Sequence, residues 1–345
     1  MLAVSSRSKL WGVSYKSATS SLPANGLLVL IVGTELASGA RKSQFAPSRR
    51  QEMNEGEVFA VLAALVWSCC VILMRISGFQ IPPVALTVFK GGVASVLFIA
   101  AIPLVGESFI PSLPAWDYLR LAASAILGIT IADTLYAAAL NRLGASLQAL
   151  AGVMYSPSMV AVGYLLFGEM LGTGELLGGT LVVTGVAVGM RKTEDVKSPR
   201  DLVVGITMAV SSHLIMAFGI LMVRDVISEH SVVWISAYRF LVATIVLSVG
   251  ASCFLSPRKV FLGFARRDIW KIMLPMSFLG PFMGTMLWTA GFKYTSVGRA
   301  AIYNQLSTVF IILLAVLFLK ERITGRKVLG LALAVSGAIV VALQK

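Results

Sequence analysis

Charged residues are scarce in this sequence: only 13% of its 345 residues are Asp, Glu, Lys or Arg, whereas 57% are hydrophobic, and the mean hydropathy is +0.85. Soluble domains of this length rarely combine so little charge with so much apolar side chain. Histidine and cysteine are scarce too, with 2 and 3 copies. The composition therefore argues against an ordinary soluble domain and favours a protein embedded in a lipid bilayer.

Several motifs of known chemistry are missing from the sequence. It has no GxxxxGK[ST] loop to bind ATP, no HExxH metalloprotease motif and no GxSxG hydrolase motif. Cys69, Cys70 and Cys253 all fall in apolar runs and have the spacing of neither a disulfide framework nor a zinc site, so we interpret them as small packing residues. We expect no cofactor, no metal and no nucleic-acid partner.

Apolar runs fill the chain after Met53. Crossing a hydrocarbon core of about 30 Å takes roughly 20 residues in a helix. Backbone groups in lipid must be satisfied within the segment, and no barrel-like alternation is present, so each run is predicted to be a helix. Ten spans result: 58–74, 81–106, 121–140, 143–168, 176–190, 202–223, 231–255, 272–292, 300–319 and 328–343. The fold class predicted is an all-α membrane protein with ten transmembrane helices.

Residues 1–52 differ from the rest of the chain. They are rich in serine and basic residues and poor in acidic ones, and their apolar patch at 27–32 is too short to span a bilayer. The patch also lies too far from the N-terminus for a usual secretion signal. We expect either a disordered tail or a true start at Met53, and an organelle transit peptide is the alternative left open.

One pattern occurs twice in the chain. Residues 167–178 read FGEMLGTGELLG, and residues 319–330, 152 positions later, read LKERITGRKVLG, with Glu, Leu and Gly in register. At a neighbouring offset of 149, Lys90 aligns with Arg239. The sequence therefore predicts two copies of a five-span unit, at 56–192 and 202–345.

Five is an odd number, so the second copy must enter the membrane from the opposite side, as in an inverted repeat. Equivalent loops also differ in charge: the loop 169–175 has no basic residue, whereas its counterpart carries Lys320, Arg322, Arg326 and Lys327. Lys and Arg are retained on the cytoplasmic side. The charges therefore place the basic loops of the second copy in the cytoplasm and both chain ends outside.

The sequence also resembles a known family. The first half contains GEVFAVLAALVWS, VFK, DTLYAAALNRLGAS, YSPSMVAVGYLLFGE and LLGGTLVVTGVAVG, and the second half contains AYRF, LWTAGFKYTS, AAIYNQLSTVFIILLAVLFLKE and VLGLALAVSGAIVV. In this order, and doubled, these motifs resemble paired EamA domains of the drug/metabolite transporter superfamily. The resemblance covers nearly all of 56–345. One departure is Lys90, where many relatives carry Arg, although Arg239 is kept in the second copy.

The resemblance implies a ten-helix secondary transporter of small metabolites, often an exporter, in a bacterial or archaeal cytoplasmic membrane. Its partners would be the bilayer and a small-molecule substrate. Relatives are usually drawn with both ends inside, which conflicts with the charge count, so the orientation stays open here. The resemblance names no substrate.

Three charged side chains are predicted at bilayer depth, where insertion costs about 2.5 to 3.5 kcal/mol each. Lys90 and Arg239 are candidate binders of anionic substrate groups; the alternative is that each snorkels or bonds carbonyls to fix its helix. Asp133 has Thr285 as its counterpart, and such an asymmetric carboxylate suits proton coupling or recognition of an amine. The alternative for Asp133 is pairing with Lys90 or a helix cap. His213 is a second proton-carrying candidate, although a lone buried His is more often a packing residue.

The fourth and ninth spans are polar where they should meet the midplane. Their candidate substrate-binding residues are Gln148 and Tyr155 in the fourth span and Asn304 and Gln305 in the ninth. Pro157 is predicted to interrupt the fourth span, and Pro275, Gly280, Pro281 and Gly284 the eighth; transporters tend to bind substrate at interrupted helices. Interhelical hydrogen bonding is the alternative.

Tyr136 and Trp288 align across the two copies and are a candidate aromatic wall, with packing or an interfacial belt as the alternative. Glu169 and Glu321 also align. Each is read as a gate, an anchor or, by default, a solvated helix-end residue.

Together these residues favour a secondary carrier of a small amphiphilic or zwitterionic metabolite, such as an amino acid, with Asp133 coupling transport to protons. We do not expect an enzyme; an intramembrane enzyme and a channel or receptor are the competing functions.

Overall fold

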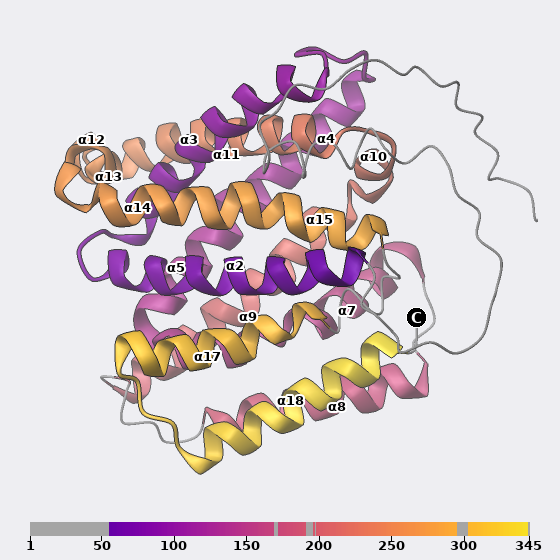
Figure 1. Ribbon diagram of the computed structural model, residues 1–345, viewed down its shortest axis with the longest axis vertical. Helices are drawn as coiled ribbons and strands as arrows, with labels where there is room; N and C mark the ends of the chain where they lie inside the picture. The colour runs from indigo at the N-terminus through magenta and orange to yellow at the C-terminus, as the bar shows by residue number, and fades with distance from the viewer. Residues whose placement is uncertain (1–54, 169–171, 191–195, 197, 295–302, 344–345) are drawn as a thin grey trace, which may run out of the picture. The chain divides into compact units, whose positions relative to one another are not determined.

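The computed structural model describes residues 55–168, 172–190, 196, 198–294 and 303–343, and every regular element in that part of the chain is helical (Figure 1). The tail predicted at 1–52, Glu169 and the start of the predicted span 300–319 lie outside the described residues. Seven helices are long and apolar enough to cross a membrane: Glu55–Gly78, Pro83–Val105, Ala115–Leu143, Ala145–Phe167, Pro199–Leu221, Val232–Phe254 and Arg267–Gly291. Leu176–Gly189 and Leu306–Leu319 are shorter apolar helices.

The elements of the first half follow the predicted spans. They are α2 (Glu55–Gly78), α3 (Pro83–Ala101), η1 (Pro103–Val105), α4 (Ala115–Ala125), η2 (Ile126–Ile131), α5 (Ala132–Leu143), α6 (Ala145–Gly152), α7 (Tyr155–Phe167) and α8 (Thr173–Gly189).

The second half has the same order of long helices. Its elements are α9 (Pro199–Leu221), α10 (Arg224–Glu229), α11 (Val232–Phe254), α12 (Pro257–Val260), α13 (Leu262–Ala265), η3 (Arg267–Ile269), α14 (Trp270–Ser277), η4 (Phe278–Gly284), α15 (Thr285–Tyr294), α17 (Leu306–Leu319) and α18 (Gly325–Leu343).

Local sequence explains where several helices begin and end. The Ser198 hydroxyl accepts the Asp201 amide at 3.1 Å, and Pro199, which lacks an amide donor, takes the first helical position of α9. Pro83 takes the same position in α3. Gly168 ends α7 in the left-handed conformation at φ 65°, which glycine adopts without steric strain.

Both halves contain irregular helix at equivalent depths. The fourth span divides into α6 and α7 at 153–154. Pro157 has no amide hydrogen to donate to the Val153 carbonyl, so the helical hydrogen bond at that point is missing. The Val153 carbonyl instead accepts the Ser156 amide at 3.4 Å. The third and eighth spans contain π-helical turns, η2 and η4, whose first residues are 152 positions apart. Pro281 lies inside η4, so the irregularity of η4 was predicted from the sequence, whereas η2 contains no proline.

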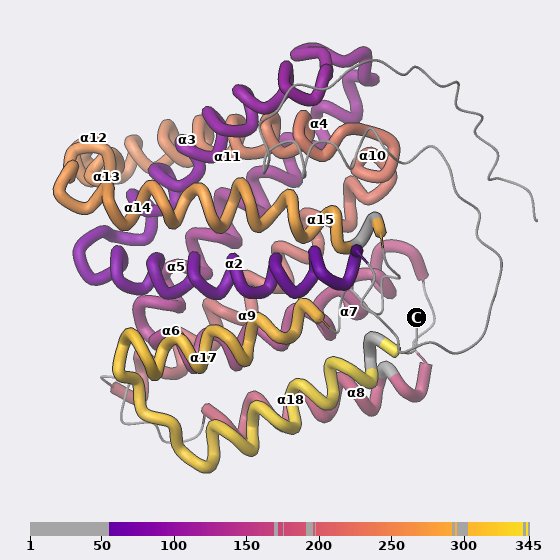
Figure 2. Tube along the Cα trace, viewed as in Figure 1, coloured from indigo at the N-terminus to yellow at the C-terminus, as the bar shows by residue number. Residues whose placement is uncertain are grey.

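Helix packing repeats when the two halves are exchanged. In the first half α2 packs against α15 and α17, and its counterpart α9 packs against α5 and α7. Two pairs are formed by a helix and its own counterpart, α3 with α11 and α8 with α18, and Figure 2 shows α8 and α18 lying side by side. The sequence repeat is therefore also a repeat of the contacts.

Glycines define the α8–α18 contact. A Cβ on Gly185 would lie 2.5 Å from the Ala334 nitrogen, and a Cβ on Gly337 would lie 2.5 Å from the Gly178 oxygen. The two glycines are 152 residues apart, and so are the equivalent partner atoms, the oxygens of Gly178 and Gly330 and the nitrogens of Val182 and Ala334. The contacts run in opposite directions along the two helices. The helices thus pack antiparallel with their backbones in contact, which only glycine permits.

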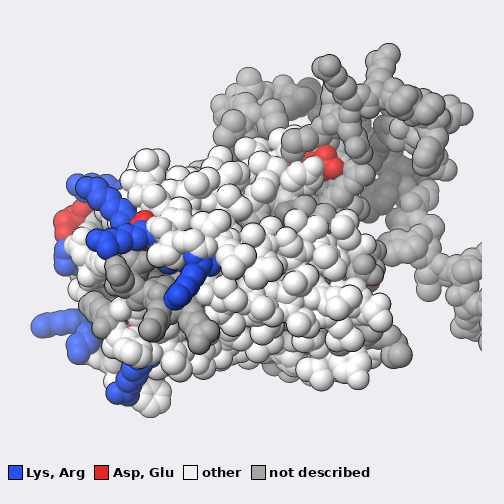
Figure 3. Space-filling model, turned by 90° about the horizontal axis from the view of Figure 1, so that it is seen from below, with Lys and Arg blue, Asp and Glu red and all other residues white. Residues whose placement is uncertain are grey.

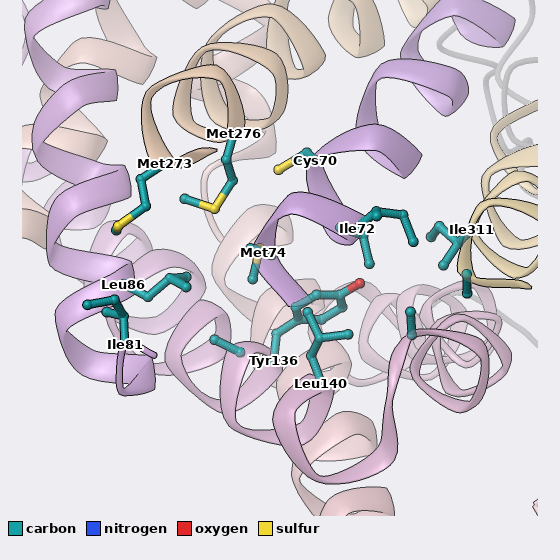
Figure 4. Packing of buried hydrophobic residues seen from close by; sticks show 14 of the residues in the cluster. Cys70, Ile72, Met74, Ile81, Leu86, Tyr136, Leu140, Met273, Met276 and Ile311 are labelled. Atoms are coloured by element: carbon teal, nitrogen blue, oxygen red, sulfur yellow. The ribbon is translucent and has the colours of Figure 1, made fainter. Parts of the chain in front are cut away.

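The α3–α11 pair is also antiparallel. The Phe98 ring stacks on Phe240 with centroids 5.7 Å apart, while Val88, closer to the start of α3, packs against Leu247, further along α11. Beside this pair, the largest apolar cluster joins α2, α3, α5, α14 and α17, with Tyr136 lying among Ile72, Met74 and Leu140 (Figure 4).

Basic side chains gather at the end of the helices where α12, α13 and the α17–α18 connection lie (Figures 1 and 3). The described elements at that end supply Arg258, Lys259, Arg266, Arg267, Lys271, Lys320, Arg322 and Arg326. At the opposite end Arg120 donates to Asp225 at 2.5 Å and to the Met222 carbonyl at 2.6 Å, which ties α4 to the start of α10. The same guanidinium holds the pKa of the exposed Asp225 carboxyl below its usual value.

Candidate functional site

A buried ion pair joins α3 to α5. The Lys90 Nζ lies 2.6 Å from Asp133 Oδ2, and the two side chains are 3% and 13% exposed. Lys90 is the eighth residue of α3, so its Cα lies about 11 Å from the helix start at a rise of about 1.5 Å per residue. Pairing with Lys90 was the predicted structural alternative for Asp133, and it is the arrangement observed. It leaves Lys90 without a free positive charge for a ligand.

Arg239 occupies the equivalent position in α11, as the eighth residue of that helix, but it has a different environment. Its side chain is half-buried, its Nε is buried without a hydrogen-bond partner, and no ion pair joins it to any described residue. Asp133 and Tyr155 are its electrostatic neighbours. Gly128, in η2, leaves room for the guanidinium, since a Cβ there would lie 3.2 Å from Arg239 Nη2.

An aromatic group surrounds His213 of α9. The Tyr136 ring of α5 and the Tyr155 ring of α7 meet its imidazole edge to face, with centroids 6.0 and 6.1 Å away. Trp67 of α2 packs on the other side of Tyr136 at 6.2 Å. His213 is 6% exposed, and both ring nitrogens are buried without a partner in the described structure. Four helices therefore converge on these rings.

Gln148 adds unsatisfied amide groups to this region. It lies in α6, is fully buried, and neither Oε1 nor Nε2 has a hydrogen-bond partner within the described residues. The Tyr136 hydroxyl is its neighbour, but the two groups do not form an aligned hydrogen bond. Buried amides that lack partners are rare, so Gln148 is poised to bond a polar group that enters the cluster.

Seven of the ten candidates are joined by the ion pair, ring contacts and electrostatic interactions described above. They are Lys90, Asp133, Tyr136, Gln148, Tyr155, His213 and Arg239, and we call them the central polar cluster. Trp288 in α15 and Asn304 and Gln305 before α17 are half-buried and belong to segments whose helices pack against α2. Trp67 was missed, although a tryptophan inside an apolar span was a usable signal.

Glu321 anchors the start of α6 and is not merely a solvated helix-end residue. Its carboxylate accepts the amides of Ala145 at 2.7 Å and Ser146 at 2.8 Å, which caps the N-terminus of α6 from the loop after α17. Arg75 of α2 donates to the Asn141 carbonyl at 2.7 Å, just before the same corner. The α5–α6 corner is thus held by one side chain from α2 and one from the loop after α17, and Gln148 lies one turn further along α6.

Within the described residues, no three His, Cys, Asp or Glu side chains gather as a metal site would require. The chain is a multi-pass α-helical membrane protein whose two similar halves meet at a buried charged cluster. The EamA-like transporter family matches residues 54–190 and 203–343. The chain belongs to this family.

Two curated bacterial relatives match part of the chain. The uncharacterized inner membrane transporter YhbE of Escherichia coli K12 is 30% identical over 102 residues, which is 30% of this chain and 31% of YhbE. The uncharacterized transporter YetK of Bacillus subtilis is 28% identical over 106 residues, 31% of each chain. The chain thus matches about a third of the length of these relatives.

One solved crystal structure shares the fold. It superposes with a TM-score of 0.61 at 19% sequence identity, covering 84% of this chain and 96% of that chain. At this identity the likeness concerns the fold alone.

Proposed function

We propose that this protein is a secondary active transporter built from two inverted five-helix repeats, ten membrane-spanning helices in all. The repeat boundaries proposed are 56–192 and 202–345. The antiparallel α3–α11 and α8–α18 pairs support the inversion, because an axis in the membrane plane turns each helix against its own counterpart. Membership of a transporter family supports transport over an enzyme.

The observation that carries this proposal is the unequal pairing of two equivalent cations. Lys90 is bonded to Asp133, whereas Arg239, at the same position of the inverted copy, is unpaired among the described residues. Inverted repeats allow each half to adopt the conformation of the other. In the second conformation Lys90 would therefore take the environment that Arg239 has here and lose Asp133, while Arg239 would face Thr285, the counterpart of Asp133. Alternating access around the central polar cluster would then break and re-form the Lys90–Asp133 ion pair.

Proton coupling is proposed at the same carboxylate. Protonation of Asp133 would break its ion pair with Lys90 and lower the barrier to separating the two side chains. His213, between Tyr136 and Tyr155, is the second candidate proton carrier. We further propose export of a small metabolite, of the amino-acid-like type that the sequence favours, across a bacterial or archaeal cytoplasmic membrane; the bacterial relatives named above support that location.

The basic end of the helices is proposed to face the cytoplasm, because Lys and Arg are retained there. This places the start of α2 outside. We expect an impermeant thiol reagent to label Glu107→Cys in intact cells and Arg322→Cys only after permeabilisation, since both positions are exposed and lie at opposite ends. The unaltered protein reports the background from Cys69, Cys70 and Cys253. The reverse pattern would overturn the proposed orientation.

Flux in sealed vesicles tests the proposed transport. Purified protein reconstituted with a library of small metabolites is expected to show accumulation of at least one compound above its equilibrium level when a pH gradient is imposed. A channel would only equilibrate the compound, and an enzyme would release a chemically altered one. Either outcome would contradict a secondary carrier, and vesicles lacking protein measure the leak.

A further inference from the structure

We infer that the central polar cluster binds an organic substrate of net charge −1 through a carboxylate held by Arg239. This rests on the proposed function and deepens it by naming the charge class of the substrate: a monoanion in place of the zwitterionic amino acid that the sequence favours.

Charge counting supports the inference. The described charged side chains at mid-helix depth are Lys90, Asp133 and Arg239. Asp133 neutralises Lys90 at 2.6 Å, so one positive charge is left over, on Arg239. A half-buried guanidinium whose Nε is buried without a partner is disfavoured, and a bound anion would balance its charge. One added negative charge makes the cluster neutral.

The geometry around Arg239 fits a carboxylate. A guanidinium offers two parallel N–H donors that match the two oxygens of a carboxylate. Gly128 lets the guanidinium approach η2 closely, since a Cβ there would lie 3.2 Å from Arg239 Nη2, and Tyr155 interacts electrostatically with Arg239. Gly280, the counterpart of Gly128 in the second half, packs against the Cys70 sulfur and not against a guanidinium, so this close approach of an arginine occurs only at Gly128.

Side chains that could contact the rest of the substrate belong to the same central polar cluster. Tyr155 contacts His213, His213 contacts Tyr136, and Tyr136 contacts Trp67, which makes a row of four rings that begins at Tyr155. Beside Tyr136 the Gln148 amide has both polar atoms free within the described structure. An organic body with an apolar part and one neutral polar group matches this lining.

A zwitterion fits less well than a monoanion. A substrate ammonium group needs a carboxylate, and the described part of the cluster offers only Asp133, whose Oδ2 is bonded to Lys90. A free amino acid would have to displace Lys90 and leave that ammonium unpaired. An acid without an ammonium group requires no such exchange.

The test uses the full chain in detergent and nine probes: alanine, leucine and phenylalanine, each as the zwitterion, as the N-acetyl monoanion and as the cationic amide. Thermal unfolding is followed against the concentration of each probe. We expect the N-acetyl members to stabilise the protein most. In Arg239→Gln their half-saturation concentration should rise on the order of 10- to 100-fold, the range for losing hydrogen bonds to a charged group. The control Lys271→Gln, at the exposed basic end, should respond like the unaltered protein.

Several results would overturn the inference: equal or stronger stabilisation by the zwitterions or amides, no shift with any monoanion, or monoanion shifts that persist in Arg239→Gln. Arg239→Lys is the second variant should Arg239→Gln not fold, and it is expected to weaken monoanion binding because it keeps the charge but loses the paired donors. Vesicle flux separates the two claims. Flux confined to another charge class leaves transport standing and overturns the anion site, whereas Arg239-dependent binding of monoanions without any flux overturns transport.

Discussion

Replacing Asp133 with asparagine is expected to abolish pH-dependent transport and to destabilise the protein. The carboxylate is 13% exposed and bonds Lys90, which is 3% exposed, at 2.6 Å. Asparagine has nearly the same shape but no charge, so the buried Lys90 ammonium would lose its partner. Removing one member of a buried ion pair typically costs about 3 to 5 kcal/mol, because it leaves an uncompensated charge. Vesicle flux at a series of pH values and chemical unfolding measure the two effects.

A double-mutant cycle separates the structural role from the transport role. Lys90→Met combined with Asp133→Asn removes both charges, so the double variant is expected to regain most of the lost stability while transport stays absent. Asp268→Asn is the control, because its ion pair with Arg266 is exposed and contributes little. If Asp133→Asn transports with an unchanged pH profile, the carboxylate does not couple transport to protons.

The helices could be predicted from the sequence because lipid leaves the backbone few choices. Apolar runs of about 20 residues have to satisfy their own hydrogen bonds, and α2, α3, α9 and α11 follow the predicted spans closely. The interruption at Pro157 was predictable for the same reason, since a missing amide has a fixed consequence. The π-helical turn η2 was not, because ILGITI contains no proline, and its one glycine, Gly128, is a residue that membrane helices often contain without interruption.

The site was predictable in its residue types but not in its pairings. Lys90, Asp133 and Arg239 stand out because charge is costly in lipid. Whether Asp133 pairs with Lys90 or with Arg239 depends on how α3, α5 and α11 cross. Hydropathy carries no information on crossing geometry. Glu321 shows the same limit: its sequence position marks a helix end, but the amides it caps belong to α6, about 175 residues away. Trp288, Asn304 and Gln305 were chosen for polarity and depth, and their part in substrate binding stays a prediction.

Substituting Gly185 with alanine is expected to disrupt the contact between the two halves. The added Cβ would lie 2.5 Å from the Ala334 nitrogen and 2.6 Å from the Gly330 oxygen, both backbone atoms that cannot move without displacing α18. Forcing atoms into a packed contact costs about 1 to 3 kcal/mol, and more where backbone has to shift. Gly337→Ala should act equally, because the same clash recurs against Gly178 and Val182. Thermal unfolding in detergent and the yield of folded protein measure the effect.

Gly179→Ala is the matched control on the same helix, because a Cβ there meets nothing within 4 Å. It should be neutral or stabilising, since alanine favours a helix over glycine by up to about 1 kcal/mol. If Gly185→Ala and Gly337→Ala were as stable as Gly179→Ala, α8 and α18 would not be in backbone contact. Their antiparallel pairing would then lose its support, and the inverted relation of the halves would rest on α3 and α11 alone.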